Sequence, residues 1–260
     1  MRRFALIGEH LGHSLSVPIH QAIFRHLGLE DDYRLMEIPR EALARQVSAL
    51  LEELDGFNVT IPYKQDVMPM LRTIEPAAAA IGAVNTVSCP DRCGYNTDAA
   101  GFSAMLRRYG IDPAGKPCYV LGTGGTSRTA CAALERMGAS RVTVVSRHPR
   151  AGQISYEQLA DEFSGVLVNT TPAGMLYQQD VCPIAPDVLP AILCRACGVA
   201  DVIYNPPETV LTRAARAAGV PACTGMYMLI HQAVAAERIW QRCPIPDDLT
   251  DTLMKELKLL

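Results

Sequence analysis

Residues 118–127 read Cys-Tyr-Val-Leu-Gly-Thr-Gly-Gly-Thr-Ser, an apolar run that leads into a glycine-rich turn. We predict a strand, a turn, a helix and a second strand in succession, over Cys118–Leu121, Gly122–Ser127, Thr126–Met137 and Arg141–Val145. This order, completed within about 30 residues, is typical of a βαβ unit that binds a dinucleotide. The stretch therefore predicts an open, parallel sheet in this part of the chain.

The glycines of this turn have distinct uses. Gly122 permits the tight turn, and Gly124 lets the backbone approach a pyrophosphate resting on the helix N-terminus. Ser127 stands where the usual fingerprint has a third glycine, but it is small enough for close helix–strand packing. We predict a nucleotide cofactor bound by Gly122, Thr123, Gly124, Gly125, Thr126 and Ser127. A glycine turn in an α/β fold without any nucleotide is the alternative.

The end of the second strand indicates which nucleotide binds. A carboxylate there would bind the ribose 2′-hydroxyl of NAD, but residues 146–150 read Ser-Arg-His-Pro-Arg, with no acid in reach. Arg147 offers the planar group that suits a 2′-phosphate, and Arg150 or Arg128 is placed to assist. The sequence thus predicts NADP rather than NAD, bound in part by Ser146, Arg147 and Arg150. For Arg150, a solvated loop charge is an equal alternative.

Two later strands also end in polar residues. Val166–Asn169 leads into the segment Thr170–Met175, and Val199–Tyr204 leads into Asn205. Ligands of open α/β sheets lie outside the carboxyl ends of the strands, so we expect both ends to border the nicotinamide, with Thr170 and Met175 among the cofactor-binding residues. For Asn169, Thr170 and Asn205, a helix cap or turn is the favoured alternative.

In the first half of the chain, residues 58–64 read Asn-Val-Thr-Ile-Pro-Tyr-Lys. Pro62 cannot donate to a strand ladder, so the strand predicted over Gly56–Ile61 should end near it. Thr60 and Lys64 then lie at a strand end, where scaffolds commonly place reactive groups. On this segment alone, a solvated lysine after an edge strand is the favoured interpretation of Lys64.

Strands alternate with helices along the whole sequence, which indicates an α/β fold with a mostly parallel sheet. A domain boundary is expected near residues 98–112, before the second αβ series. The other expected helices are Pro18–Leu27, Arg40–Leu54, Thr73–Ile81 and one from Asp98 through Tyr109, and the other expected strands are Phe4–Ile7, Tyr33–Ile38 and Ala83–Ser88.

Composition narrows the functional class. The 260 residues are 49% hydrophobic and 20% charged, as in ordinary soluble globular proteins, and the net charge of −3 argues against nucleic acid or an anionic membrane as the main partner. The apolar runs are too short for a membrane span, and the N-terminus lacks the form of a signal peptide.

Nine cysteines without an export signal indicate reduced thiols in a cytoplasm. The pairs Cys89/Cys93 and Cys194/Cys197 have irregular spacing, and the second lies in an expected helix, so zinc or redox chemistry is disfavoured and no metal is predicted.

Eight motifs in order resemble the shikimate dehydrogenase family (NADP-dependent shikimate/quinate dehydrogenases) over nearly the whole chain. They are His13–Ser16, Asn58–Lys64, Gly82–Thr86, Tyr95–Asp98, the glycine turn, Asn169–Met175, Asp201–Pro206 and Gly225–Gln232. The resemblance implies NADP-dependent interconversion of 3-dehydroshikimate and shikimate, on the route to chorismate and aromatic amino acids. It also implies a substrate domain, 1–98 completed by 226–260, a Rossmann-like NADP domain, 99–225, and a catalytic cleft between them.

The same motifs imply roles for individual residues. Ser14 and Ser16 would bind the substrate carboxylate, and Tyr204 would lie near the substrate. The ring hydroxyls would be bound by Thr60, Lys64, Asn85, Asp98 and Gln232, and Gly225 would join the cofactor site. The chain departs from the usual pattern at Val17, Gln21, Ser127 and Met226–Met228.

The catalytic residues implied by the resemblance are Lys64 and Asp98. An ionised Asp98 favours a charged Lys64 while burial disfavours it, so the sequence leaves the protonation state of the pair open. We hypothesise that the two act as a unit, with Lys64 donating to the substrate carbonyl during reduction. Alternatives are a paralogue that uses NAD or another cyclohexane acid such as quinate, and a non-catalytic module that senses the ligand. Monomer and homodimer both fit.

Overall fold

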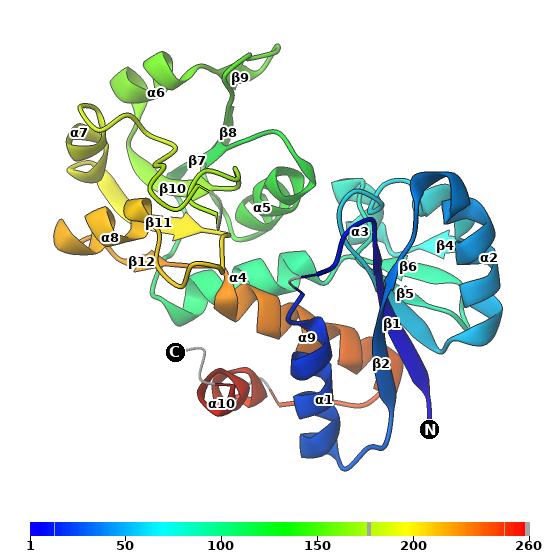
Figure 1. Ribbon diagram of the computed structural model, residues 1–260. Coiled ribbons are helices and arrows are strands. Elements are labelled where there is room, and N and C mark those ends of the chain that lie inside the picture. The colour runs from blue at the N-terminus through cyan, green and yellow to red at the C-terminus, as the bar shows by residue number, and fades with distance from the viewer. Residues whose placement is uncertain (13, 176–177, 247, 258–260) are drawn as a thin grey trace. The chain divides into compact units, whose positions relative to one another are not determined.

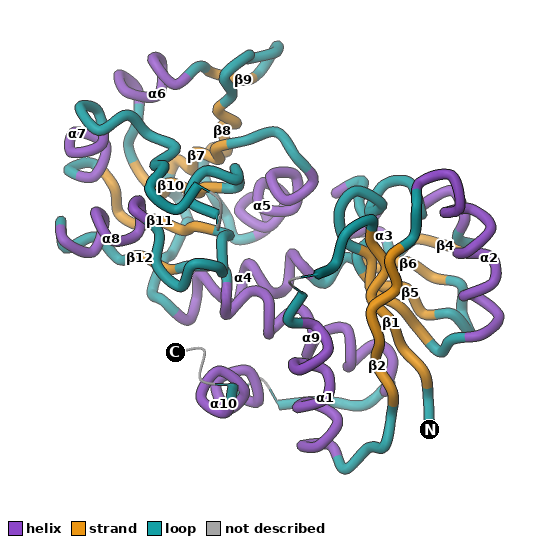
Figure 2. The backbone as a smooth tube through the Cα atoms, in the orientation of Figure 1, coloured by secondary structure: helices purple, strands orange, loops and turns teal. Residues whose placement is uncertain are grey.

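The computed structural model describes residues 1–12, 14–175, 178–246 and 248–257, so His13 of the first motif lies outside the described residues. The chain forms two compact units, Met1–Asp98 with Ile230–Leu260, and Ala99–Leu229. Each unit contains a six-stranded sheet with helices against it (Figures 1 and 2). The predicted α/β class is therefore confirmed.

The sheet of the first unit has the strand order β2-β1-β3-β5-β6-β4. Strand β1 pairs in parallel with β2 and β3, and β4 pairs in parallel with β6, whereas β5 is antiparallel to both β3 and β6. The elements are β1 (Arg3–Gly8), α1 (Ser16–Leu27), β2 (Asp32–Glu37), a 3₁₀ turn (Arg40–Ala42), α2 (Leu43–Glu53), β3 (Gly56–Val59), a second 3₁₀ turn (Met68–Met70), β4 (Thr73–Ile74), α3 (Pro76–Ile81), β5 (Thr86–Ser88), β6 (Cys93–Tyr95), α9 (Met226–Gln241) and α10 (Leu249–Glu256).

Side chains of β1 alternate between two apolar cores, as the strand period of two requires. Phe4 and Leu6 pack in a cluster with Phe24 of α1 and Trp240 of α9. The alternate residues Ala5 and Ile7 join a larger cluster formed with α2. Figure 1 accordingly shows α1 and α9 on one face of this sheet and α2 on the other. A strand that is apolar on both faces thus becomes the centre of the first unit.

The second unit has a parallel sheet in the order β12-β11-β10-β7-β8-β9. Its elements are α4 (Asp98–Arg108, whose first residue belongs to the first unit), β7 (Pro117–Leu121), α5 (Gly125–Arg136), β8 (Arg141–Val145), β9 (Gln153–Ile154), α6 (Tyr156–Glu162), β10 (Gly165–Asn169), α7 (Leu189–Leu193), β11 (Ala196–Asp201), α8 (Val210–Ala217) and β12 (Ala222–Cys223). Tyr119 and Leu121 of β7 pack in a cluster with α6, α7 and α8, and α5 lies against β7 and β8.

Four expectations about local structure are wrong in part. Thr73–Ile74 form a short strand, and α3 begins only at Pro76, where the Glu75 side chain caps the helix by accepting from the Ala78 N–H. Residues 83–85 precede β5 instead of belonging to it. Strand β11 ends at Asp201, and Tyr204 lies in the following loop. The Val202 N–H still bonds the Asn169 carbonyl of β10, but the Ile203 N–H bonds the Asp201 side chain. Cys197 lies in β11, not in a helix.

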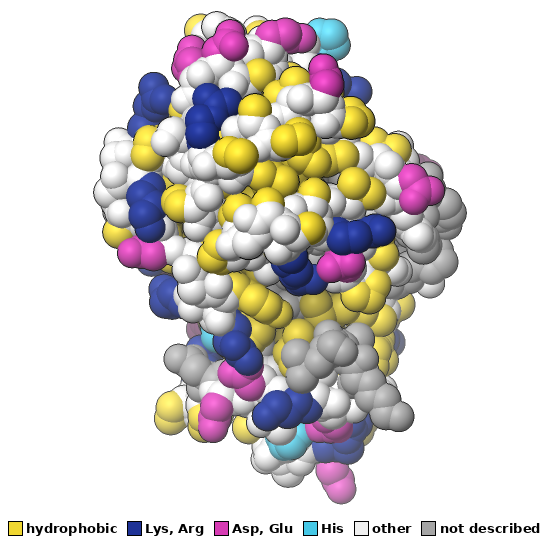
Figure 3. Space-filling view, turned by 90° about the vertical axis from the view of Figure 1, so that its left-hand side faces the viewer, with side chains coloured by type: hydrophobic (Ala, Val, Ile, Leu, Met, Phe, Trp, Pro, Cys, Tyr) yellow, Lys and Arg dark blue, Asp and Glu magenta, His cyan; other side chains and the backbone are white. Residues whose placement is uncertain are grey.

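The surface shown in Figure 3 mixes acidic and basic side chains around hydrophobic ones. No helix within the described residues is both long and apolar enough to cross a bilayer.

All nine cysteines are free thiols, and burial raises the pKa of Cys89, Cys118 and Cys223 to about 12. These three thiols therefore stay protonated near neutral pH, which makes them poor nucleophiles.

We expect Gly56→Ala to destabilise the first unit. An added Cβ at Gly56 would lie 2.3 Å from Trp240 Nε1 and would displace an indole that donates to the Val87 carbonyl at 2.9 Å. Overpacking of this kind costs about 1–3 kcal/mol, measurable by urea unfolding. Gly12→Ala is the matched control, because its Cβ would meet nothing within 4 Å. Equal stability of the two variants would contradict the packing argument.

Candidate functional site

The segment that follows β3 turns sharply and returns towards the sheet. The Thr60 N–H bonds the Ile7 carbonyl at 2.9 Å, and the Tyr63 N–H bonds the Thr60 carbonyl at 3.0 Å. Tyr63 is fully buried, and its hydroxyl donates to the Ile38 carbonyl at 2.5 Å. These bonds hold Thr60 directly at the strand end and bring Lys64 back beside the neighbouring segment, where its carbonyl accepts from the Val84 N–H at 2.8 Å.

Lys64 and Asp98 form an ion pair. Lys64 Nζ donates to Asp98 Oδ2 at 2.6 Å, and the two side chains are only 21% and 13% exposed. Asp98 is the first residue of α4, where a carboxylate also interacts favourably with the helix dipole. Lys64 is therefore not a solvated surface charge. It is an ammonium held by a partner that itself sits at a fixed helix start.

Asn85 lies at the centre of a buried hydrogen-bond network. Its Oδ1 accepts from the Thr97 N–H at 2.7 Å and from the Thr86 hydroxyl at 3.1 Å. Its Nδ2 donates to Thr97 Oγ1 at 3.0 Å and to Gln232 Oε1 at 3.4 Å. The Oδ1 atom can only accept, so a hydrogen bond donated to a ligand would have to come from Nδ2, whose bond to Gln232 is the longer of its two.

Ser14 and Ser16 lie together at the start of α1. The Ser14 hydroxyl donates to Ser16 Oγ at 3.1 Å and accepts from the Ser16 N–H at 3.2 Å. The N-cap residue of α1, Leu15, has no side-chain oxygen to cap the first turn. Two hydroxyls and an uncapped helix start supply the donors that an anion requires.

The glycine turn of the second unit is shaped by close packing at one end and open space at the other. Gly122 has φ +107°, and a Cβ there would lie 2.9 Å from Thr170 Oγ1. Gly124 is the N-cap of α5 and offers no side chain to cap the helix. Neither Gly124 nor Gly125 has any atom within 4 Å of an added Cβ. The protein itself therefore does not require glycine at these two positions, which fits a turn that leaves room for a phosphate group.

The remaining residues of this turn differ in exposure. Ser127 is 2% exposed, consistent with the close packing expected of a small residue there, whereas Thr123 is exposed and Thr126 half-buried. After β8, Arg147 and Arg150 are exposed in one short turn, in which Ser146 Oγ accepts from the His148 N–H at 3.1 Å. Both arginines are thus placed at the end of the neighbouring strand.

The loops after β10 and β11 carry the other predicted residues. Thr170 donates to the Leu121 carbonyl from both its N–H (3.0 Å) and its hydroxyl (2.6 Å), which ties this loop to the glycine turn. Met175 is 48% exposed, and Tyr204 is half-buried, so burial raises the pKa of its phenol. A Cβ on Gly225 would lie 2.0 Å from the Val202 carbonyl oxygen, so Gly225 has a packing reason to be glycine.

Comparison with known proteins identifies the family. The family described as shikimate dehydrogenase substrate binding domain matches residues 6–87. A "Shikimate dehydrogenase (NADP(+))" of Clostridium beijerinckii is 37% identical, with 97% of each chain covered. The chain belongs to the shikimate dehydrogenase family.

Solved structures agree. A chorismate mutase/shikimate 5-dehydrogenase fusion protein from Clostridium acetobutylicum has a TM-score of 0.93 and 36% identity, covering 99% of this chain and 97% of that one. A shikimate 5-dehydrogenase from Thermus thermophilus, solved in complex with NADP(H) and shikimate, has a TM-score of 0.86 and 31% identity, covering 100% of both chains.

The sequence did not predict the buried polar groups that hydrogen-bond to Asn85 and its neighbours. The Tyr33 hydroxyl donates to Asn58 Oδ1 at 2.7 Å, and Asn58 Nδ2 donates to the Asn85 carbonyl (3.1 Å) and to Thr86 Oγ1 (3.0 Å). Asn58 was visible as a polar residue in an apolar strand, which is a signal for a buried network. Its hydrogen-bonding partners could not be predicted, because they come from distant parts of the sequence.

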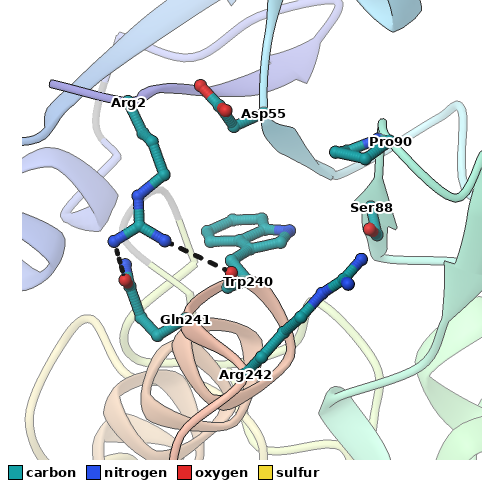
Figure 4. Close-up of a pocket in the computed structure, with 7 residues that line it drawn as sticks. All are labelled: Arg2, Asp55, Ser88, Pro90, Trp240, Gln241 and Arg242. Carbon is teal, nitrogen blue, oxygen red and sulfur yellow. Dashed lines mark hydrogen bonds between the residues drawn. The ribbon is translucent and has the colours of Figure 1, made fainter.

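A separate pocket lies at the other end of the first sheet (Figure 4). Its volume is about 330 Å³, and it is lined by Arg2, Asp55, Ser88, Pro90, Trp240, Gln241 and Arg242. Gly56 pairs with Ser88 there, at the start of β3, whereas the candidate site lies beyond its end. Both arginines already have acidic partners, Arg2 with Asp31 at 3.0 Å and Arg242 with Asp91 at 2.8 Å. We therefore do not include this pocket in the candidate site.

We expect Asn85→Leu to lower the free energy of unfolding by about 2–3 kcal/mol, because it leaves the buried Thr97 N–H and the Thr86 hydroxyl without their partner. Thr97→Val is the matched variant. It removes one hydroxyl from the same network but keeps the backbone donor, and we expect a loss of about 1 kcal/mol. Chemical denaturation measures both. A loss in Asn85→Leu no larger than that in Thr97→Val would contradict a central place for Asn85.

Proposed function

We propose that this chain is an NADP-dependent oxidoreductase that interconverts 3-dehydroshikimate and shikimate, within the biosynthesis of chorismate and aromatic amino acids. The observation that carries the proposal is the largely buried Lys64–Asp98 pair, next to a network of neutral hydrogen-bonding groups, in a chain of this family. We assign substrate binding to the first unit and NADP binding to the second.

The substrate is an anion with several hydroxyl groups, and the described side chains match those features. Ser14 and Ser16 supply hydroxyl donors for the carboxylate at the start of α1. Asn85 Nδ2 and Gln232 of α9 supply a donor and an acceptor for ring hydroxyls, with Thr60 at the end of β3. Neutral partners suit neutral hydroxyls, since each buried hydroxyl without a partner costs about 1–3 kcal/mol.

The second unit fits the cofactor. Gly124 and Gly125 leave open space in front of α5, whose first turn has no side-chain cap, so backbone N–H groups there can bind the pyrophosphate. Arg147, with Ser146 and Arg150, would bind the 2′-phosphate. When bound, NADPH supplies the hydride for reduction of the ketone.

Lys64 is the residue that transfers the proton. Reduction of the carbonyl creates an alkoxide that needs one proton, and the Lys64 ammonium can hydrogen-bond this oxygen and supply it. Asp98, whose Oδ2 accepts from Lys64 Nζ at 2.6 Å, fixes the direction of this Nζ. In the oxidation of shikimate, the neutral amine of Lys64 accepts the hydroxyl proton and becomes the ammonium.

The direct test is to follow NADPH absorbance while purified protein oxidises shikimate, with quinate and NAD as alternative substrate and cofactor. We expect shikimate with NADP to give the highest kcat/KM. Highest activity with quinate or NAD would favour the paralogue, and binding without turnover would favour a ligand sensor.

The cytoplasm is the proposed location, since free cysteines suit a reducing compartment.

We expect Lys64→Ala to lower kcat by about 10²–10⁴ with little change in KM for shikimate, because the lysine acts on the reacting oxygen in the transition state. Steady-state kinetics at saturating NADP measures both constants. Lys116→Ala is the control, because Lys116 is a lysine of the second unit whose Nζ donates to the nearby Asp112 carbonyl in an exposed turn. Near-normal turnover in Lys64→Ala would overturn the assignment.

We expect Arg147→Ala to raise KM for NADP by about tenfold or more and to leave KM for NAD nearly unchanged. The reason is that a charge-assisted hydrogen bond to the 2′-phosphate is worth about 1.5–3 kcal/mol and that NAD lacks this group. Arg136→Ala, in the last turn of α5, is the matched control. Parallel losses with both cofactors would place Arg147 outside the 2′-phosphate site.

A further inference from the structure

Asp201 is a buried acid to which the reaction assigns no role. It is the last residue of β11 and is 0% exposed. Its Oδ1 accepts from the Ile203 N–H at 3.1 Å and from Asn169 Nδ2 at 3.1 Å, and its Oδ2 accepts from the Thr209 hydroxyl at 2.9 Å. All three donors are neutral, so hydrogen bonds alone compensate the burial of this carboxylate.

The bond to Asn169 reaches the loop after β10. Asn169 Oδ1 accepts from the N–H (3.0 Å) and the hydroxyl (2.7 Å) of Thr171, and its Nδ2 also donates to the Ala173 carbonyl at 3.2 Å. Between them, Thr170 is bonded to the Leu121 carbonyl beside Gly122. A side-chain amide thus determines the path of the loop that lies against the glycine turn.

The other two bonds reach the loop after β11. The Ile203 N–H is bound just after the strand ends, and Thr209 is the N-cap of α8. Both ends of the segment that carries Tyr204 are therefore tied to one carboxylate. The two loops also touch, because a Cβ on Gly174 would lie 3.3 Å from side-chain atoms of Ile203 and of Thr209.

We propose that Asp201 is a positioning residue that sets the conformation of both loops, and with it the shape of the cofactor site. The inference rests on the proposed function, since it assumes that NADP(H) occupies the glycine turn of this unit. Asp201 does not touch the cofactor itself. It acts through Asn169 on one loop and through Ile203 and Thr209 on the other.

Two substitutions separate positioning from simple stability. In Asp201→Asn, the side-chain oxygen can still accept from Ile203 and Asn169, and the Thr209 hydroxyl can turn to accept from the new amide. In Asp201→Ala, all three donors lose their partner. We expect the dissociation constant for NADPH, measured by its fluorescence, to rise about tenfold or more in Asp201→Ala and to stay within about threefold in Asp201→Asn.

Tyr119→Phe is the matched control. It removes two hydrogen bonds of a buried side chain of the same sheet without touching either loop. The Tyr119 hydroxyl donates to the Glu162 carbonyl at 3.0 Å and accepts from Arg141 at 2.9 Å. We expect it to lower the melting temperature but not the affinity for NADPH. If Asp201→Ala does not fold, Asn169→Ala takes its place, because it breaks the same link from the β10 side and should also weaken NADPH binding.

The difference in stability between the wild type and Asp201→Asn should also depend on pH. Burial raises the pKa of Asp201 from 3.8 to about 6, against the effect of its three hydrogen bonds. The folded state then binds more protons than the unfolded state between these values, so the stabilisation is complete below pH 3.8 and is lost as pH rises through about 6. The facing titratable groups are the thiols of Cys182 and Cys223, and Arg216 acts on Cys223. We expect the wild-type melting temperature to fall, relative to that of Asp201→Asn, as pH rises from 3.8 to about 6.

The outcomes are distinct. Loss of stability in Asp201→Ala with an unchanged dissociation constant for NADPH would overturn the positioning role, and so would an Asp201→Asn variant as weak as Asp201→Ala. Failure of the wild type to oxidise shikimate while it binds NADPH would contradict the proposed function. It would leave the positioning role of Asp201 to be decided by the binding data.

Discussion

The short segment Val84–Asn85 is the point on which the arrangement of the first unit depends. The Val84 N–H bonds the Lys64 carbonyl, the Asn85 carbonyl accepts from the Val59 N–H, and Asn85 Oδ1 accepts from the Thr97 N–H. These three bonds join the turn that carries Lys64, the end of β3 and the start of α4. Because Asp98 follows Thr97 directly, they place its carboxylate 2.6 Å from Lys64 Nζ, so the proposed proton transfer needs little reorganisation of this pair.

In the second unit, as in the first, an asparagine side chain joins neighbouring segments of the chain. Asn169 ends a parallel strand, accepts from a backbone N–H two residues later and donates to Asp201 at the end of the neighbouring strand, much as Asn85 binds Thr97 and Gln232. An amide is suited to this use because it offers a donor and an acceptor without a charge. The turn role favoured by the sequence for Asn169 is thus visible in the structure, whereas Thr170 bonds the Leu121 carbonyl of the neighbouring strand. Both residues shape the loop that lies against the glycine turn.

How much could be predicted from sequence depended on how local the determining interactions are. The glycine turn, β8 and the flanking helix were predictable because apolar runs and glycines act on their immediate neighbours. Strands β4 and β6 have two and three residues and were missed, since their strand character comes only from pairing Thr73 with Cys93 and Thr86 with Tyr95. The approach of Gln232 to Asn85 joins residues 147 positions apart, and only resemblance to a family indicated it. Asp201 received no role because nothing in its own neighbourhood shows that Asn169 donates to it.

Asp98 and Asp201 differ in how their charge is compensated, and this difference suits their positions. Asp98 has an ammonium partner, so its pairing with Lys64 depends on opposite charges. Asp201 has only neutral donors, and burial raises its pKa to about 6. Both forms of Asp201 can nonetheless keep the loops in place. Asn169 and Ile203 donate to Oδ1 in either state, and Thr209, whose hydroxyl rotates, can donate to a carboxylate oxygen or accept from a carboxyl group. A carboxyl group with such partners can lose or gain its proton without releasing the loops that it holds.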